Sequence, residues 1–435
     1  MVDAEMQDGS TQELFMRLDR GDPAASGDPF TLDREARFYA ALEGTAVPVP
    51  RLVASHQTVQ AILTERVAGE PWFSRLTDES ARLAVAREFM TKLAALHRVD
   101  VSRVDLDEPR ATVRDGLEAD IARWEGMYRF GDAPKDPTIE FGLLWLKANA
   151  PDTGAMRPVI VQGDTGPGNF LYDHGRVTAV LDWELAHFGD PMADLGWLAL
   201  RAVQEPFTNL ADRLADYERE SGIAVDLRRL RYYRIFAELK VVILSYRRTL
   251  DIDVLSEVGN GLGFEGLHGR LFVDALAEQY GLRLQLPDRP AVPPTADDYL
   301  FEVMLAQFKE IVVPGSADPF VALRAKGLAR IVKYLRQVDQ YGDWSSDREL
   351  DAAEAILGYR PVTSRDARKL VSDQMDDAAL HDSQYVEYLW ICAHVRHELL
   401  RPAMGVLADR HFDPLPDEID QDLAPLPKEK QRSNA

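Results

Sequence analysis

The sequence predicts an α+β protein with a small β-rich N-terminal lobe, a larger helical lobe and an additional all-helical C-terminal domain. In the first 70 residues, β-prone runs surround a single helical stretch. Between 71 and 286, apolar residues recur every three or four positions, as in amphipathic helices. Four prolines within 287–294 then indicate a linker. The expected parts are an N-lobe at 1–70, a helical lobe at 71–286, a linker at 287–298, a helical domain at 299–413 and a Pro-rich, charged, disordered tail at 414–435.

The first lobe is predicted to hold three strands and one helix. The strands are expected at 13–18, around 52–54 and at 61–67, where β-branched and other apolar residues cluster. The helix is expected at 31–42, with Thr31 or Asp33 near its start.

The most informative segment lies in the second lobe. An apolar run at 159–161 leads into a glycine-rich loop that carries Asp164 and Asn169. Two β-prone runs, 170–172 and 177–181, follow with a turn-type spacer between them, which predicts a hairpin. Pairing these strands brings Asn169, before the first strand, close to Asp182, after the second.

Phosphoryl transfer from a metal–nucleotide complex requires this set of groups. One carboxylate orients or deprotonates the attacking hydroxyl, while an amide oxygen and a second carboxylate hold the metal on the phosphates. The alternative is that Asp164 only caps a loop and Asp182 only ends a strand. Because three polar groups are placed to converge, we favour the catalytic interpretation.

These residues resemble the aminoglycoside phosphotransferase-like kinases, a superfamily that includes choline, homoserine and fructosamine kinases. The matching segments are QGDTGPGN at 162–169, DWE at 182–184 and GDPMADL at 189–195. The sequence of these segments is most similar to the branch of the family that also occurs as a kinase domain joined to acyl-CoA dehydrogenases. The resemblance implies a protein-kinase-like, two-lobed fold. Gln162 replaces the histidine of the family pattern, and we expect it to brace the loop by hydrogen bonding.

The resemblance also implies roles for the catalytic segment. Asp164 would be the base, and Asn169 and Asp182 would bind Mg²⁺, with Glu184 as an additional metal contact. Asp190 is expected to cap a helix that begins at Pro191. Asp194, within the first turns of that helix, would support the loop.

In the first lobe, the resemblance implies a site for ATP or GTP. Arg17 would take the place of the phosphate-binding lysine, with Glu35 as its helix partner. Glu65 to Val67 would form the hinge, where backbone groups meet the base. The residues from Met1 to Gln12 are too few and too polar for the two strands that cover the phosphates in relatives. We therefore expect either a truncated start or an incomplete lid.

The sequence thus indicates an enzyme that phosphorylates a hydroxyl of a small molecule. The alternative is a non-catalytic nucleotide-binding regulator or scaffold, favoured by Gln162, the short N-terminus and the added helical domain. That domain is expected to carry helices around 328–335 and 386–392, and it offers a surface for a protein partner. The acceptor is left open, since an amino alcohol or a hydroxyacyl thioester suits this chemistry as well as an aminoglycoside.

Two further patterns, a glycine-rich string and a pair of histidines, are interpreted as structural rather than as binding sites. The GLGFEG string at 261–266 lacks a preceding strand, so we interpret it as a flexible loop rather than a dinucleotide site. His394 and His397 follow the single cysteine, Cys392, but they make a poor metal site and are expected to be packed or solvent-facing.

Composition restricts the partners. Seventy-two acidic and 50 basic residues give a net charge of −22, which argues against nucleic acid. There is no apolar run of membrane-spanning length and no leader pattern, so neither a membrane span nor a signal peptide is predicted. A single cysteine fits a cytoplasmic protein.

Overall fold

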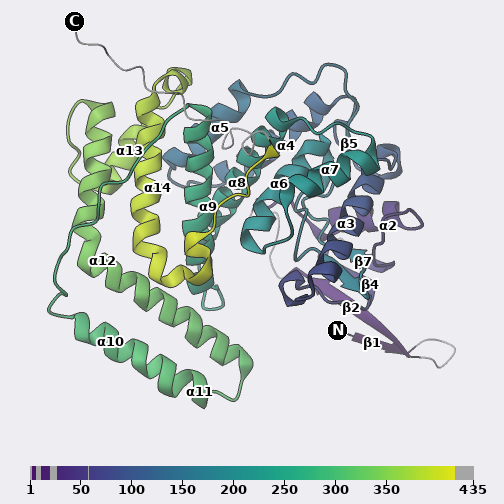
Figure 1. The fold of residues 1–435 in the computed structure, drawn as a ribbon, viewed down its shortest axis with the longest axis horizontal. Helices are drawn as coiled ribbons and strands as arrows, with labels where there is room; N and C mark the ends of the chain where they lie inside the picture. The colour runs from purple at the N-terminus through teal and green to yellow at the C-terminus, as the bar shows by residue number, and fades with distance from the viewer. Residues whose placement is uncertain (1, 6–10, 20–26, 57, 417–435) are drawn as a thin grey trace, which may run out of the picture.

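The N-terminal lobe is a four-stranded antiparallel sheet with one helix. The computed structural model describes residues 2–5, 11–19, 27–56 and 58–416 (Figure 1). The strand order is β1-β2-β4-β3, and α2 packs against β3 and β4. The elements are β1 (Val2–Glu5), β2 (Thr11–Leu18), α2 (Leu32–Leu42), β3 (Leu52–His56) and β4 (Ala61–Glu65).

The start of the chain differs in part from the prediction. One strand, β1, precedes β2 and pairs with it so that Val2 lies opposite Leu14. The polar composition of this segment does not prevent pairing, because a strand ladder is made by backbone groups. The helix agrees with the prediction: the Thr31 side chain accepts a hydrogen bond from the Arg34 amide, and Phe38 and Leu42 are fully buried.

The second lobe is mostly helical and holds two small strand pairs. Strand β5 (Val159–Val161) pairs with β8 (His187–Gly189), and β6 (Phe170–Asp173) forms the predicted hairpin with β7 (Arg176–Val180). The two-lobed α+β organisation is confirmed. The helices of this lobe are α3 (Glu79–Leu96), α4 (Val113–Arg129), α5 (Pro137–Ala148), α6 (Pro191–Gln204), α7 (Leu210–Ser221), α8 (Leu227–Leu250) and α9 (Val258–Gln279), with short helices η1 (Phe73–Arg75) and η2 (Val101–Arg103).

The C-terminal region is all-helical, as predicted. Residues 282–295 are irregular, as expected of the linker. The helices that follow are α10 (Asp298–Gln307), the π-helical η3 (Phe308–Val312), α11 (Val313–Gly315), α12 (Pro319–Leu357), α13 (Ser364–Gln374), η4 (Asp377–His381), α14 (Ser383–Met404) and η5 (Gly405–Asp409). From residue 417 onwards, the predicted tail lies outside the described residues.

The C-terminal helices pack directly on the second lobe. Helix α14 lies along α9 and α12 (Figure 1), and α13 contacts α5. Val371 and Tyr388 belong to the same buried apolar cluster as Phe141 and Phe272. The boundary at 287–298 stays a prediction, but the two parts share one continuous core.

The interpretation of 261–266 as a flexible loop was wrong, because this segment lies inside α9. Two glycines of this helix allow other helices to approach. A Cβ on Gly259 would lie 2.1 Å from the Gly327 carbonyl oxygen of α12, and one on Gly266 would lie 2.9 Å from the Met404 sulfur of α14. Close packing between helices, rather than flexibility, therefore explains these residues.

His394 and His397 are held by protein groups, as expected. His394 Nε2 lies 2.7 Å from Asp274, and His397 Nδ1 lies 3.1 Å from the Gly266 carbonyl oxygen. In the part of the chain that the structure describes, each helix is too short or too polar to cross a bilayer.

Candidate active site

The glycine-rich loop between β5 and β6 is anchored by Asp194, one turn into α6. Asp194 accepts hydrogen bonds from the Gln162 and Gly163 amides, each at 3.0 Å, and from the Thr165 hydroxyl. His97, at the end of α3, contacts it at 3.0 Å. Burial alone would raise the pKa of Asp194, but His97 and the loop donors hold it below its ordinary value. Asp194 is therefore an ionised anchor for the loop.

Gln162 links the loop to the end of β7. Its side-chain amide donates to the Leu181 carbonyl at 2.9 Å and to the Asp182 carbonyl at 3.2 Å. This is the bracing expected of the residue that replaces histidine. Gly166 has a φ of +144°, and a Cβ there would lie 2.6 Å from the Cβ of Arg201. Its lack of a side chain allows the loop to approach α6.

Asp164 lies between two partners that fix its carboxylate. The Asn169 amide donates to Asp164 Oδ2 at 2.7 Å and to its carbonyl at 2.8 Å. Arg201, from α6, approaches the same carboxylate at 3.0 Å and 3.2 Å. Burial raises the pKa of Asp164 to about 6, although Arg201 opposes this shift. Asp164 is thus ionised at neutral pH but titrates near the physiological range.

Three carboxylates converge where the two lobes meet. Oxygen atoms of Glu35, Asp182 and Glu184 lie within 4.8 Å of one another. Asp182 follows β7 with a φ of +62°, in the left-handed region that L-residues rarely adopt. Such backbone strain is typical of functional sites.

Arg17 lies among these three carboxylates. Its guanidinium contacts Glu35 at 2.9 Å, Asp182 at 2.8 Å and also Glu184. Burial alone would lower the pKa of Arg17, but the three negative charges raise it. Burial and the neighbouring carboxylates raise the pKa of Glu184 above its ordinary value.

The donor set fits a divalent cation that prefers oxygen ligands. Asp182 and Glu184 offer carboxylate oxygens that are about one-third exposed. Asn169 uses its amide nitrogen on Asp164, which leaves its amide oxygen available. The Leu181 amide donates to the Asn169 carbonyl at 2.8 Å, so Asn169 is held beside the end of β7. The predicted ligands are therefore close together, and Glu35 joins them.

The predicted hinge begins at Glu65, the last residue of β4. The Glu65 side chain is engaged by Gln12, at 2.7 Å, and by Arg51, and its backbone N–H donates to the Arg51 carbonyl at 2.9 Å. Within the described residues, the Val67 backbone makes no hydrogen bond. The chain then reaches Glu70, which forms an isolated bridge with Tyr172 of β6. The hinge is thereby joined to the hairpin that carries Asn169.

Sequence reasoning missed Arg201 and His97. Arg201 lies seven positions after Asp194, two turns along the same helix face, which is a signal that could have indicated it. The residues around His97 do not indicate its role, because its partners Asp194 and Tyr217 lie about 100 positions later in the chain.

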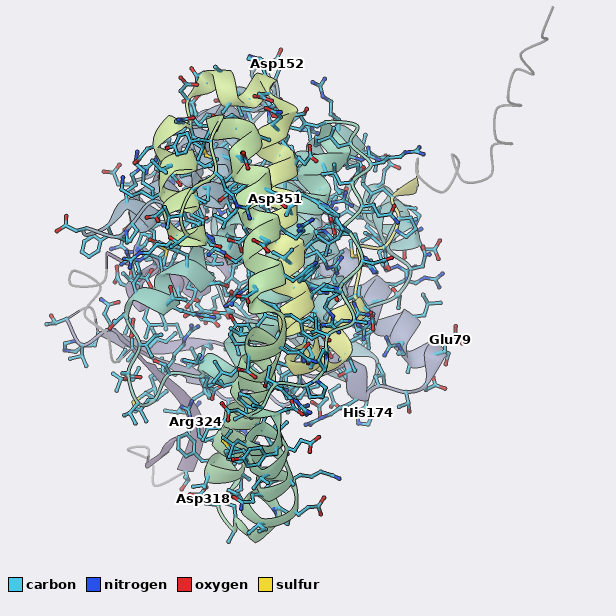
Figure 2. The ribbon with its side chains drawn as sticks, turned by 90° about the vertical axis from the view of Figure 1, so that its left-hand side faces the viewer. Glu79, Asp152, His174, Asp318, Arg324 and Asp351 are labelled. Atoms are coloured by element: carbon cyan, nitrogen blue, oxygen red, sulfur yellow. The ribbon has the colours of Figure 1, made fainter. Side chains whose placement is uncertain are left out.

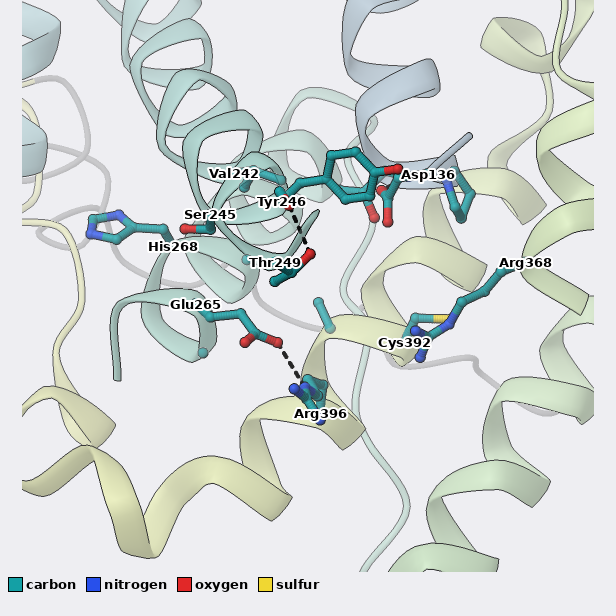
Figure 3. Close-up of a pocket in the computed structure, with 15 residues that line it drawn as sticks. Asp136, Val242, Ser245, Tyr246, Thr249, Glu265, His268, Arg368, Cys392 and Arg396 are labelled. Atoms are coloured by element: carbon teal, nitrogen blue, oxygen red, sulfur yellow. Dashed lines mark hydrogen bonds and ion pairs between the residues drawn. The ribbon is translucent and has the colours of Figure 1, made fainter. Parts of the chain in front are cut away.

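A chain of polar side chains continues beyond Arg201. Arg201 donates to Gln204 at 3.0 Å, Gln204 to His268 at 2.8 Å, and His268 to Glu238 at 2.7 Å. His268 also lines a cavity of about 360 Å³ between α8, α9 and α14. Figure 3 shows His268 beside this cavity, with the Glu265–Arg396 pair near it. The contacts of Asp164 therefore extend to the wall of a cavity that the C-terminal helices help to form.

Residues 6–233 match the model of the phosphotransferase enzyme family. Among curated proteins, acyl-CoA dehydrogenase family member 11 of Rattus norvegicus is 26% identical over 295 residues, covering 61% of this chain and 37% of that protein. Acyl-CoA dehydrogenase family member 10 of Mus musculus is 29% identical over 180 residues, covering 39% and 16% respectively. The chain thus spans well under half the length of these relatives.

A solved structure from Ralstonia eutropha, provisionally assigned as an aminoglycoside phosphotransferase, is 23% identical to the chain. The similarity covers 62% of this chain and 92% of that one, with a TM-score of 0.47.

Proposed function

Because this chain belongs to the phosphotransferase enzyme family, we propose that it transfers the γ-phosphoryl group of ATP or GTP to a hydroxyl of a small molecule. The observation that carries this proposal is the position of Asp164. It lies on a braced loop, beside Asn169, and near enough to Asp182 for the two carboxylate charges to interact. This is the arrangement that in-line transfer from a metal–nucleotide complex requires.

Asp164 is proposed to orient the acceptor hydroxyl and accept its proton. Its pKa of about 6 suits this role, since a base is most effective near the operating pH. Asn169 and Arg201 restrict the orientation of its carboxylate. Arg201 acts through Asp164 and is a positioning residue.

The nucleotide is proposed to bind between the lobes. Arg17, held by Glu35, would turn to the phosphates, and the backbone of Glu65 to Val67 would meet the base. Asn169, Asp182 and Glu184 would hold Mg²⁺. When bound, this ion would neutralise phosphate charge.

One observation favours a second candidate, a regulator that binds nucleotide without transferring phosphate. Arg17 already pairs with the three carboxylates, so a protein cation occupies the cluster before any ligand enters. Such a protein would bind nucleotide but would show no turnover with any acceptor.

The test begins by measuring ATP consumption, with and without Mg²⁺, across a set of hydroxyl compounds that includes amino alcohols, aminoglycosides and hydroxyacyl thioesters. Nucleotide binding is measured in parallel by titration. Acceptor-dependent ADP release supports the enzyme. Nucleotide binding without ADP release from any compound supports the regulator and overturns the enzyme.

Two substitutions then separate the proposed roles. Asp164→Asn should lower turnover by about 10²–10⁴-fold and leave Mg–nucleotide binding nearly intact, because positioned bases contribute in that range. Asp182→Ala should instead weaken Mg–nucleotide binding. Asp173→Asn, at the exposed end of β6, is the matched control and should change neither. Full activity of Asp164→Asn would refute the assigned roles.

A further inference from the structure

Residues 298–340 form a helical arm that extends from the body of the protein. The arm comprises α10, η3, α11 and the first half of α12, and it lies at the edge of the molecule (Figure 1). Figure 2 shows Asp318 near its far end, away from the rest of the fold. The arm is one-tenth of the chain.

The arm carries an unusual share of exposed apolar side chains. Among the described residues, 29 large hydrophobic side chains are exposed, and 12 of them lie in the arm. Tyr299, Val303 and Ile311 are 50–64% exposed on the α10 side. Scattered exposed hydrophobic residues are normal, but a concentration of this kind marks an interaction surface.

The exposed residues of α12 follow the spacing of a helix–helix interface. Val321, Leu328 and Leu335 recur every seven residues and are each about half exposed. This is one seam of a heptad repeat, which packs against a partner helix. The sides of α10 and α12 that face each other already interact, since Arg336 of α12 forms two hydrogen bonds with Asp298 of α10, each at 2.6 Å.

The arm is also held firmly at its base. The backbone of Gly259 in α9 approaches Gly327, and Arg324 donates to the backbone carbonyls of Leu255 and Ser256. A surface that is ordered in the free protein loses little conformational entropy when it binds.

We propose that a second copy of this chain covers the arm, so that α10 and α12 of both copies form a four-helix bundle. Charge supports this occupant. The chain carries a net charge of −22, but residues 298–340 hold six basic and five acidic side chains, so two arms meet without strong charge repulsion.

The available area also supports a second copy. The 12 side chains, exposed by 36–64%, offer on the order of 1,000 Å² of surface, and a stable interface uses about 800 Å² per partner. A two-fold axis lets the same apolar surface serve both copies.

The experiment measures the mass of the full chain by light scattering after size-exclusion chromatography, over a range of protein concentrations. Wild type should have twice the 48.8 kDa mass of one chain. Val303→Glu with Leu328→Glu should halve the mass, because four carboxylates would enter the bundle. The control, Val362→Glu with Val406→Glu, adds the same charge at residues 87% and 78% exposed outside the arm and should leave the mass unchanged.

Circular dichroism and thermal melting should be the same for all three proteins, since the substituted residues are exposed. A monomeric wild type, or an arm variant that keeps the double mass, would overturn the proposal. So would a monomer that sediments with phosphatidylcholine–phosphatidylserine vesicles, because the arm would then bind a membrane. None of these measurements needs a substrate, so the outcome is independent of the proposed phosphoryl transfer.

Discussion

Replacing Arg201 by glutamine should shift the pH dependence of the reaction without abolishing it. Arg201 lies 3.0 Å from Asp164 and is the main group that opposes the effect of burial on its pKa. The neutral amide can still hydrogen-bond but carries no charge. The carboxylate should therefore hold its proton to higher pH.

The size of the shift follows from the geometry. An opposite charge within 4–6 Å lowers a carboxyl pKa by about 1–3 units. The glutamine amide keeps part of this effect through its hydrogen bond, so the substitution should raise the pKa of Asp164 by about 1–2 units, from about 6 to roughly 7–8. At pH 7 the ionised fraction would fall from about nine-tenths to between one-half and one-tenth. We therefore expect kcat/KM at pH 7 to fall by about 2–10-fold and to recover at pH 9.

The assay is kcat/KM for ADP release against pH, with the acceptor found in the compound screen. Wild type should lose activity as the pH falls through 6, because protonated Asp164 accepts no proton. Arg201→Lys keeps the charge and should remain close to wild type. Arg219→Gln, at a side chain 61% exposed on α7, is the control. An unshifted profile in Arg201→Gln, or an equal loss at every pH, would refute the reasoning.

Two other predictions concern stability and domain organisation. His97→Phe should lower the free energy of unfolding by about 1–3 kcal/mol, because the buried Asp194 carboxylate loses a partner; urea denaturation measures this, and an unchanged midpoint would contradict it. Limited proteolysis should cut within the irregular segment 282–295, and the two fragments should still elute together because α14 packs on α9. Separation of the fragments in native buffer would show that the shared core does not hold them.

Local patterns predicted the parts of the site that depend on neighbouring residues. The β6–β7 hairpin was predicted from two β-prone runs and a turn, and it brings Asn169 beside Asp182 as expected. The cap at Asp190 was predicted from its position before Pro191, and its side chain accepts from the Met192 amide. The pair Arg17–Glu35, implied by the family resemblance, is an ion pair in the structure.

Features that depend on distant contacts could not be predicted. The contact between His97 and Asp194 joins residues 97 positions apart. The segment 261–266 was interpreted as a loop because no strand precedes it, but it lies within α9, where Gly266 packs closely against Met404 of α14. The prolines at 287–294 indicated a boundary, yet proline content says nothing about which apolar surfaces meet across it.

The shared core has a consequence for the order in which the protein is made. The face of α9 that α14 covers leaves the ribosome about 125 residues before the end of α14, which is roughly 6–25 s of synthesis at 5–20 residues per second. During that interval the nascent helical lobe presents an uncovered apolar helix. Chaperones that bind exposed hydrophobic segments therefore have an opportunity to bind α9 between its synthesis and that of α14.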